Sequence, residues 1–104
     1  MKTEEELLLE LRDLNHPTDE KRLDEILNLN RQIKSERIQS QVADNYRSIA
    51  EVIHLDAMAS KFGKPETGWK CALEMWEKVK PFYPNDTDID GLILECKSSL
   101  KEKL

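Results

Sequence analysis

The chain has 104 residues, and its 21 Asp and Glu against 16 Lys and Arg give a formal net charge of -5. Hydrophobic residues make up 38% and charged residues 36%, while three glycines and four prolines are too few for a sheet of many short strands, so an all-α fold is favoured. The acidity argues against direct binding to nucleic-acid phosphates, and no apolar run reaches the roughly 20 residues of a membrane span.

A first helix is expected to begin after Thr3. The Thr3 hydroxyl and the Glu6 carboxylate can form a capping box, in which each accepts a hydrogen bond from the other residue's backbone N–H. Leucines then recur at helical spacing, and Asn15 and Pro17 close the segment. The leucines of this face are Leu7, Leu8, Leu11 and Leu14.

Residues 18–62 contain neither glycine nor proline. Because an average helix has only about 11 to 12 residues, we expect a break near residues 28–30 or 35–40. The alternative is one continuous helix, which could pair with a second copy of the chain to form a homodimer through residues 18–62. The apolar positions form a sparse series and then a denser one: Leu23, Ile26, Leu27, Ile33 and Ile38, followed by Val42, Tyr46, Ile49, Ile53 and Ala57.

Three basic residues, Arg31, Lys34 and Arg37, recur every three positions within this stretch. On a helix they could form a small basic strip, which is a candidate surface for a partner. The alternative is an ordinary solvated helix face.

A further helix is expected after Gly63, which can cap the preceding helix, and Pro65, which prevents its continuation. Thr67 can cap the new helix, and Pro81 and Pro84 end it. Its predicted buried face consists of Trp69, Ala72, Leu73, Trp76 and Val79.

The last helix is expected to follow residues 85–87, any of which can cap it. Asp88 and Asp90 lie in its first turn and Lys97 and Lys101 lie toward its end, which is the polarity that the helix dipole prefers. Its apolar face consists of Ile89, Leu92, Ile93, Cys96 and Leu100.

One stretch has the order aromatic, small, aromatic, small and then proline, at Trp69, Ala72, Trp76, Val79 and Pro84. This order resembles the second helix of a tetratricopeptide repeat, although among the positions of the repeat's first helix only Ser60 is a good match. The resemblance implies an antiparallel helix pair over residues 40–80, covered by the C-terminal helix, with protein or peptide binding as the usual role. An unrelated helical bundle with the same packing is the alternative.

Together these patterns predict one domain, residues 1–104, built as a small bundle of about five helices. Residues 40–104 are expected to form the tetratricopeptide-like hairpin with its C-terminal capping helix. The helices over residues 3–38 are less strongly patterned.

Residues 86–91 read Asp-Thr-Asp-Ile-Asp-Gly, the first half of a calcium-binding loop. The twelfth position of such a loop needs a bidentate Glu, and here it is Lys97. Pro84 also interrupts the helix that would enter the loop. We therefore predict that these acids cap the last helix, with no metal and no cofactor.

The two histidines, His16 and His54, lack the spacing of metal ligands. Cys71 and His54 could form a nucleophilic pair if the fold brings them together, yet Cys71 shares the helix of Trp69 and is expected to be half-buried. No enzymatic activity is predicted. Two cysteines are also too few for a secreted disulfide framework, so a cytoplasmic location is expected.

The predicted function is binding of another protein, as an interaction module or adaptor without enzymatic activity. The candidate surface combines exposed positions of residues 40–62 with the turn at Phe82 and Tyr83. The alternative is a small acidic inhibitor of phage or mobile-element origin, which would mimic nucleic acid and block a host or defence protein. Neither hypothesis involves a membrane.

Overall fold

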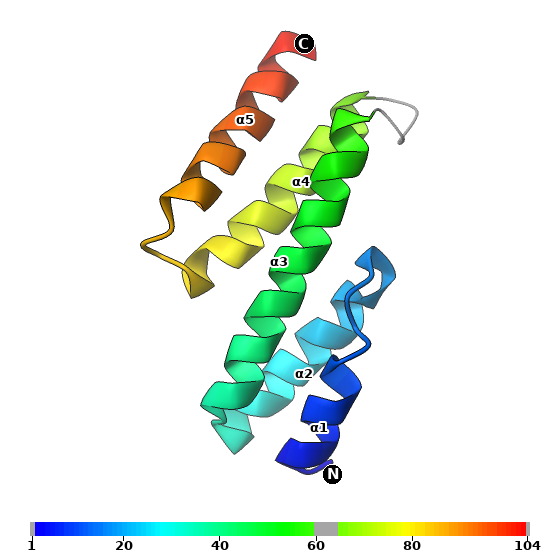
Figure 1. Ribbon diagram of the computed structural model, residues 1–104, viewed down its shortest axis with the longest axis vertical. Coiled ribbons are helices and arrows are strands. Elements are labelled where there is room, and N and C mark those ends of the chain that lie inside the picture. The colour runs from blue at the N-terminus through cyan, green and yellow to red at the C-terminus, as the bar shows by residue number, and fades with distance from the viewer. Residues whose placement is uncertain (1, 60–64, 104) are drawn as a thin grey trace. The chain divides into compact units, whose positions relative to one another are not determined.

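The computed structural model describes residues 2–59 and 65–103, and within these ranges every regular element is a helix (Figure 1). The all-α fold expected from the composition is thus confirmed. In the described part of the chain, no helix combines the length and the apolar character needed to cross a membrane. The elements are α1 (Glu4–Leu11), η1 (Pro17–Asp19), α2 (Glu20–Ile33), α3 (Glu36–Met58), α4 (Pro65–Val79), η2 (Lys80–Phe82) and α5 (Thr87–Lys103), where η marks a 3₁₀-helix.

The chain divides into two compact units, residues 1–49 and residues 50–104. The division falls inside α3, so that this helix supplies its first part to one unit and its last part to the other. Each unit has buried apolar residues of its own.

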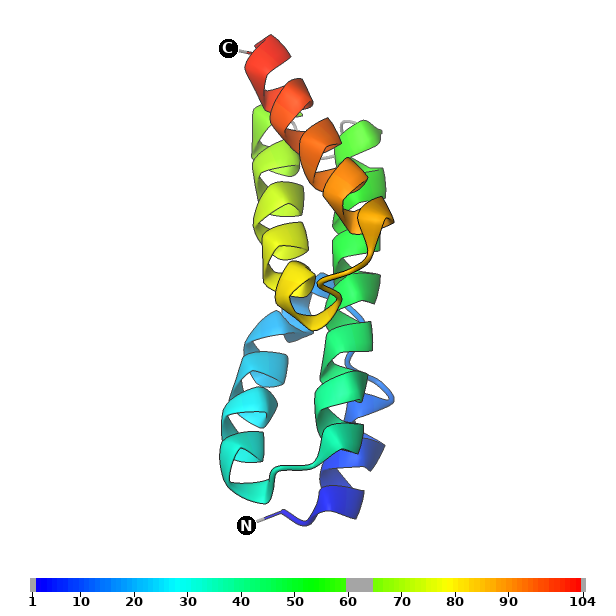
Figure 2. The ribbon, with the colours of Figure 1, turned by 90° about the vertical axis from the view of Figure 1, so that its left-hand side faces the viewer.

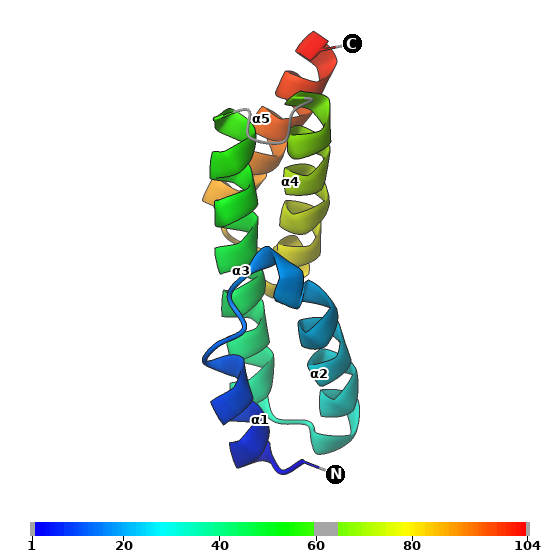
Figure 3. The ribbon, with the colours of Figure 1, turned by 90° about the vertical axis from the view of Figure 1, so that its right-hand side faces the viewer.

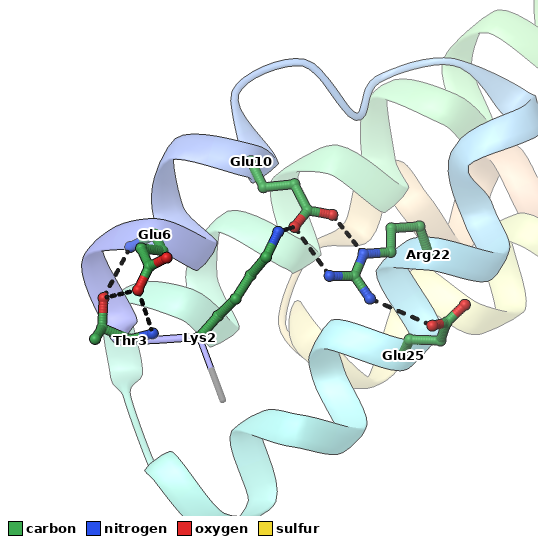
Figure 4. A network of polar contacts seen from close by, with 6 residues as sticks. All are labelled: Lys2, Thr3, Glu6, Glu10, Arg22 and Glu25. Carbon is green, nitrogen blue, oxygen red and sulfur yellow. Dashed lines mark hydrogen bonds and ion pairs between the residues drawn. The ribbon is translucent and has the colours of Figure 1, made fainter.

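In the first unit, α1 begins with the predicted capping box. The Glu6 N–H donates to the Thr3 hydroxyl at 3.2 Å, and a Glu6 carboxylate oxygen accepts from the Thr3 N–H at 3.2 Å (Figure 4). Leu7 and Leu11 are fully buried, whereas the other two leucines of the predicted face are half-buried. Figure 3 shows α1 and α2 packed beside the first part of α3.

Glu10 connects α1 to α2. Its carboxylate accepts a hydrogen bond from the Lys2 Nζ at 2.7 Å and from the guanidinium of Arg22, which also reaches Glu25 at 3.3 Å (Figure 4). The hydrogen bonds from Arg22, and then those from Lys2, lower the pKa of Glu10 to about 2. The same contact raises the pKa of Arg22.

A short turn at residues 34–35 separates α2 from α3, which confirms a break between two helices at the start of the second predicted range. Lys34 has φ 57°, a left-handed conformation that commonly ends a helix. The Asn30 amide donates to the Ser35 carbonyl at 2.9 Å and accepts from the Ser35 N–H at 3.0 Å. The Ser35 hydroxyl accepts from the Ile38 N–H at 3.1 Å and caps α3.

The denser apolar series of the middle stretch is buried along α3. Two polar side chains on the same face are satisfied within the first unit. The Asn45 amide donates to the Leu11 carbonyl at 2.7 Å, and the Tyr46 hydroxyl donates to the Asp24 carboxylate. Burial, followed by this hydrogen bond, raises the pKa of Tyr46.

In the second unit, Figure 2 shows α4 beside the end of α3 and α5 lying across the pair. The two tryptophans are buried, as predicted, and Met75 is buried where Leu73 was expected, while Leu73 is half-buried. The buried residues of this unit include Ile53, Ala57, Trp69, Ala72, Met75, Trp76, Val79, Ile89 and Cys96.

The start of α4 corrects one expectation. This helix begins at Pro65, two residues before the cap expected at Thr67, so Thr67 lies in its first turn. Proline suits the first helical position because its φ is fixed near the helical value and because its missing N–H has no partner there in any case. The caps and matches predicted at Gly63 and Ser60 lie outside the described residues.

Candidate functional site

A surface groove in the second unit is the strongest candidate site. It has a volume of about 270 Å³ and lies where the side chains of three helices meet. The lining residues are Glu51, His54 and Leu55 of α3, Trp76 of α4 and Leu92 of α5.

His54 is the polar centre of this groove and is only 5% exposed. Its Nδ1 accepts a hydrogen bond from the indole N–H of Trp76 at 3.2 Å, and its Nε2 lies 2.9 Å from a carboxylate oxygen of Glu95. The ring of Trp69 meets the imidazole edge-on, with centroids 5.2 Å apart. One imidazole therefore joins side chains from all three helices of the unit.

These contacts fix the protonation of the imidazole. An indole N–H can only donate, so Nδ1 of His54 must be the unprotonated nitrogen that accepts from Trp76. The proton of the neutral ring then lies on Nε2 and is donated to Glu95. The result is a directed chain from Trp76 through His54 to Glu95, with every donor matched to an acceptor.

The thiol beside His54 belongs to Cys96, whereas the sequence suggested a pair with Cys71. The Cys96 sulfur lies 3.7 Å from Nδ1 of His54, and the residue is fully buried. Burial, and then the charge of Glu95, raise the pKa of Cys96 to about 11. A catalytic thiolate needs a lowered pKa and access to solvent, so this arrangement serves packing and not nucleophilic attack.

On α3 the groove lining includes an exposed leucine, Leu55, and an exposed glutamate, Glu51. Leu55 is 64% exposed, and Met58, which lies one helical turn further along the same side of α3, is 57% exposed. Large apolar side chains that gather beside a groove are typical of binding surfaces.

A carboxylate on α5 lies beside the groove and contacts its lining residue His54. Glu95 is 46% exposed, and one of its oxygens accepts from the neutral His54 ring. No described residue places a cation within ion-pair distance of Glu95, and the positions three and four residues away on α5 are Leu92, Gly91, Ser98 and Ser99. The groove thus has an exposed leucine in its lining and, next to its residue His54, a carboxylate with no cation beside it among the described residues.

The five residues predicted from sequence to bind a partner lie outside this groove. Arg31 is in α2, Lys34 ends that helix, and Arg37 is in α3, so the three do not follow one helix face. Arg37 also forms ion pairs with Glu4 at 3.1 Å and Glu5 at 3.5 Å. Phe82 and Tyr83 are half-buried at the end of η2.

The groove residues were missed because no local motif marks them. The one signal was His54 itself, an ionisable residue between Ile53 and Leu55 on the predicted buried side of a helix. Its partners Trp76 and Glu95 are 22 and 41 residues away in the chain, so only the fold reveals the group.

The calcium-like stretch acts as a helix cap. One carboxylate oxygen of Asp86 accepts from the N–H groups of Asp88 at 2.9 Å and Ile89 at 3.3 Å, the second and third residues of α5, as the side chain of a helix N-cap does. Asp90 forms an ion pair with Lys80 at 2.7 Å. Among the described residues, no group of three or more His, Cys, Asp or Glu is arranged to hold a metal ion.

Comparisons with family models, with curated proteins and with solved structures found no match to this chain. The resemblance to a tetratricopeptide repeat therefore stays a prediction.

Proposed function

We propose that this protein is a non-enzymatic interaction module that accepts an apolar side chain of another protein in the groove of its second unit. The observation that carries the proposal is the groove itself, whose lining includes Leu55, Leu92 and the hydrogen-bonded Trp76. A site whose largest side chain is already held in place loses little conformational freedom on binding.

The composition of the groove supports this function further. Aromatic and aliphatic anchors in a pocket contribute most of the binding free energy at protein interfaces. A pocket for a small polar substrate would instead need several converging hydrogen-bond donors and acceptors. Here the nitrogens of His54 are both engaged, by Trp76 and by Glu95.

The alternative of an acidic nucleic-acid mimic receives less support. A mimic must present carboxylates whose charge is not neutralised within the molecule. In the acidic first unit, Glu4 and Glu5 pair with Arg37, and Glu10 pairs with Lys2 and Arg22. These pairs weaken the negative potential that a mimic would need.

The test is affinity capture from extracts of the source cells, with three immobilised variants beside the wild type. Leu55→Glu places a charge at the groove edge, and Leu94→Glu is its matched control because Leu94 has the same 64% exposure. Leu94 lies two residues after Leu92, about 200° around the helix, and so points away from the groove. Tyr83→Ala tests the turn suggested by the sequence.

The proposal expects a protein that is retained by the wild type, by Leu94→Glu and by Tyr83→Ala, and lost with Leu55→Glu. Retention by all four proteins, or loss only with Tyr83→Ala, would contradict the groove as the binding site. Sedimentation of the wild type alone tests the homodimer, since a self-associating chain would not need an external partner.

A further inference from the structure

We infer that the natural occupant of the groove is an amphipathic helix of a partner protein, which inserts a leucine-like side chain beside Leu55 and pairs a Lys or Arg with Glu95. This inference rests on the proposed function and adds the chemistry of the partner. A single ligand would then contact both the exposed Leu55 of the groove lining and the carboxylate of Glu95, which lies 2.9 Å from His54 of the same lining.

The helical form of the occupant follows from the shape of the receptor. Addition of a peptide strand needs an exposed sheet edge, and the described residues contain no strand. Proline-rich peptides need a row of aromatic side chains, whereas Trp76 is the one aromatic ring apart from the imidazole in the groove lining. A groove where three helices meet, with the exposed Met58 one turn beyond Leu55 on α3, suits an apolar helix face with anchors three or four residues apart.

The expectation that the occupant carries a Lys or Arg is based on the surroundings of the Glu95 carboxylate. The carboxylate is about half exposed, one oxygen is held by His54, and no described cation balances its charge. A partner Lys or Arg could reach the other oxygen without displacing His54. Such a pair at the rim of an apolar contact sets register and selects against acidic partners.

Other acidic side chains of the protein form ion pairs within the chain. Glu10 and Asp90, for example, already have a Lys or Arg partner within the chain. Glu95 combines exposure, lack of a cation and proximity to an apolar groove.

A second copy of this chain is the less favourable occupant. Its exposed Leu94 with Lys97 three residues further along α5 has similar chemistry, yet each copy carries a net charge of -5, which opposes association of two copies. The experiment below separates the two occupants.

The test is selection from a displayed library of helical peptides. The peptides have an alanine and glutamine scaffold, and the positions along one face are randomised among Leu, Lys, Glu, Gln and Ala. Selection is run in parallel on the wild type, on Glu95→Gln and on Leu55→Glu. Glu95→Gln keeps an oxygen that can accept from His54 and removes only the charge.

We expect the wild type to enrich peptides with Leu three or four residues apart and with Lys beside them. Glu95→Gln should keep the Leu preference and lose the Lys preference, and a selected peptide should bind it about tenfold more weakly. Salt should weaken binding to the wild type more than binding to Glu95→Gln.

Four outcomes would overturn the inference. Enrichment of Leu without Lys would remove the cation and leave the proposed function intact. Enrichment that is the same on Leu55→Glu, or no enrichment of Leu at all, would remove the proposed function as well. Self-association of the wild type that Leu94→Glu abolishes would make a second copy the occupant.

Discussion

The indole N–H of Trp76 and Nδ1 of His54 form a buried hydrogen bond of 3.2 Å between α4 and α3. Because the indole can only donate, this bond selects the neutral imidazole with its proton on Nε2. The bond therefore sets both the position of Trp76 in the lining of the groove and the direction in which His54 donates.

Removal of this acceptor should destabilise the fold. In His54→Phe the Trp76 N–H stays buried without an acceptor, and we expect the free energy of unfolding to fall by about 1–3 kcal/mol. Trp76→Phe removes the donor. The double variant has no unpaired donor, so its loss in free energy of unfolding should be smaller than the sum of the losses in the two single variants. Urea denaturation followed by circular dichroism measures all four proteins, and strictly additive costs would contradict the coupling.

The two cysteines should differ in reactivity. Cys96 is fully buried with a pKa raised to about 11, whereas Cys71 is half-buried on α4. Since the thiolate is the reacting form, iodoacetamide should modify Cys71 in the native protein and modify Cys96 only after unfolding. Mass spectrometry of the wild type and of Cys71→Ser locates the label. Equal rates at both cysteines in the native state would be inconsistent with the buried position of Cys96.

The ion pair between Glu10 and Arg22 should make stability depend on acid pH. Glu10 has a folded pKa of about 2, below its ordinary value of 4.5, so its contribution is present above pH 4.5 and is lost as the pH falls toward 2. After allowance for solvent screening, Glu10→Gln should lower the free energy of unfolding by about 1 kcal/mol at neutral pH. The difference from the wild type should shrink as the pH approaches 2.

Urea denaturation at several pH values provides this measurement. Glu5→Gln is the control, because the side chain of Glu5 is 76% exposed in its pair with Arg37 and should contribute less than about 0.5 kcal/mol. A gap between wild type and Glu10→Gln that persists unchanged at pH 2 would argue against the lowered pKa.

Replacement of Lys34 by glycine, in the left-handed turn after α2, should stabilise the protein. Lys34 adopts φ 57°, which strains a residue with a Cβ atom but not glycine. Lys34→Gly is expected to raise the free energy of unfolding by about 0.5–1 kcal/mol. Lys70→Gly, at an exposed position inside α4, should instead lower it by about 1 kcal/mol. Thermal melts of both variants measure these changes. A loss of stability in Lys34→Gly would contradict the prediction that Lys34 is strained.

Inside α5, replacement of a glycine by alanine should stabilise the protein. Gly91 lies inside the helix, and a Cβ atom added there meets nothing within 4 Å. Gly91→Ala should therefore raise the free energy of unfolding by about 0.5–1 kcal/mol through helix propensity alone. A melting temperature that stays the same or falls would show that the position is constrained by a contact.

The helices could be predicted from the sequence because their signals are local. The capping box of Thr3 and Glu6 depends on two residues in one turn, and the buried faces of α3 and α4 follow a period of 3.6. Such local patterns have a limit at Leu73 and Met75. The sequence predicted that Leu73 is buried, but Met75 is buried instead, and both residues fit a broad apolar face. Which of them is buried depends on the helices packed against it.

The turn between α2 and α3 was predicted only as a region. Lys34 gives no sign in the sequence that it adopts a left-handed conformation, a position where glycine is usual. The turn is held instead by the paired hydrogen bonds of Asn30 with Ser35, which form once the chain has reversed.

The groove could not be predicted because its parts come from three helices. From the sequence, His54 lacked the spacing of a metal ligand, and Cys71 was the thiol that the fold could bring to it. The relative rotation of α3, α4 and α5 decides which thiol meets the imidazole, and it selects Cys96. Such rotations result from packing between side chains far apart in the chain, which no local pattern encodes.

The position of Trp76 also makes it an intrinsic fluorescent probe of the groove. Its indole is buried and hydrogen-bonded beside the groove, so an occupant of the groove would change the environment of the ring and alter its emission wavelength. The emission of Trp69, the other indole, can be removed by a Trp69→Phe substitution. Ligands could then be screened by intrinsic fluorescence, without any attached dye.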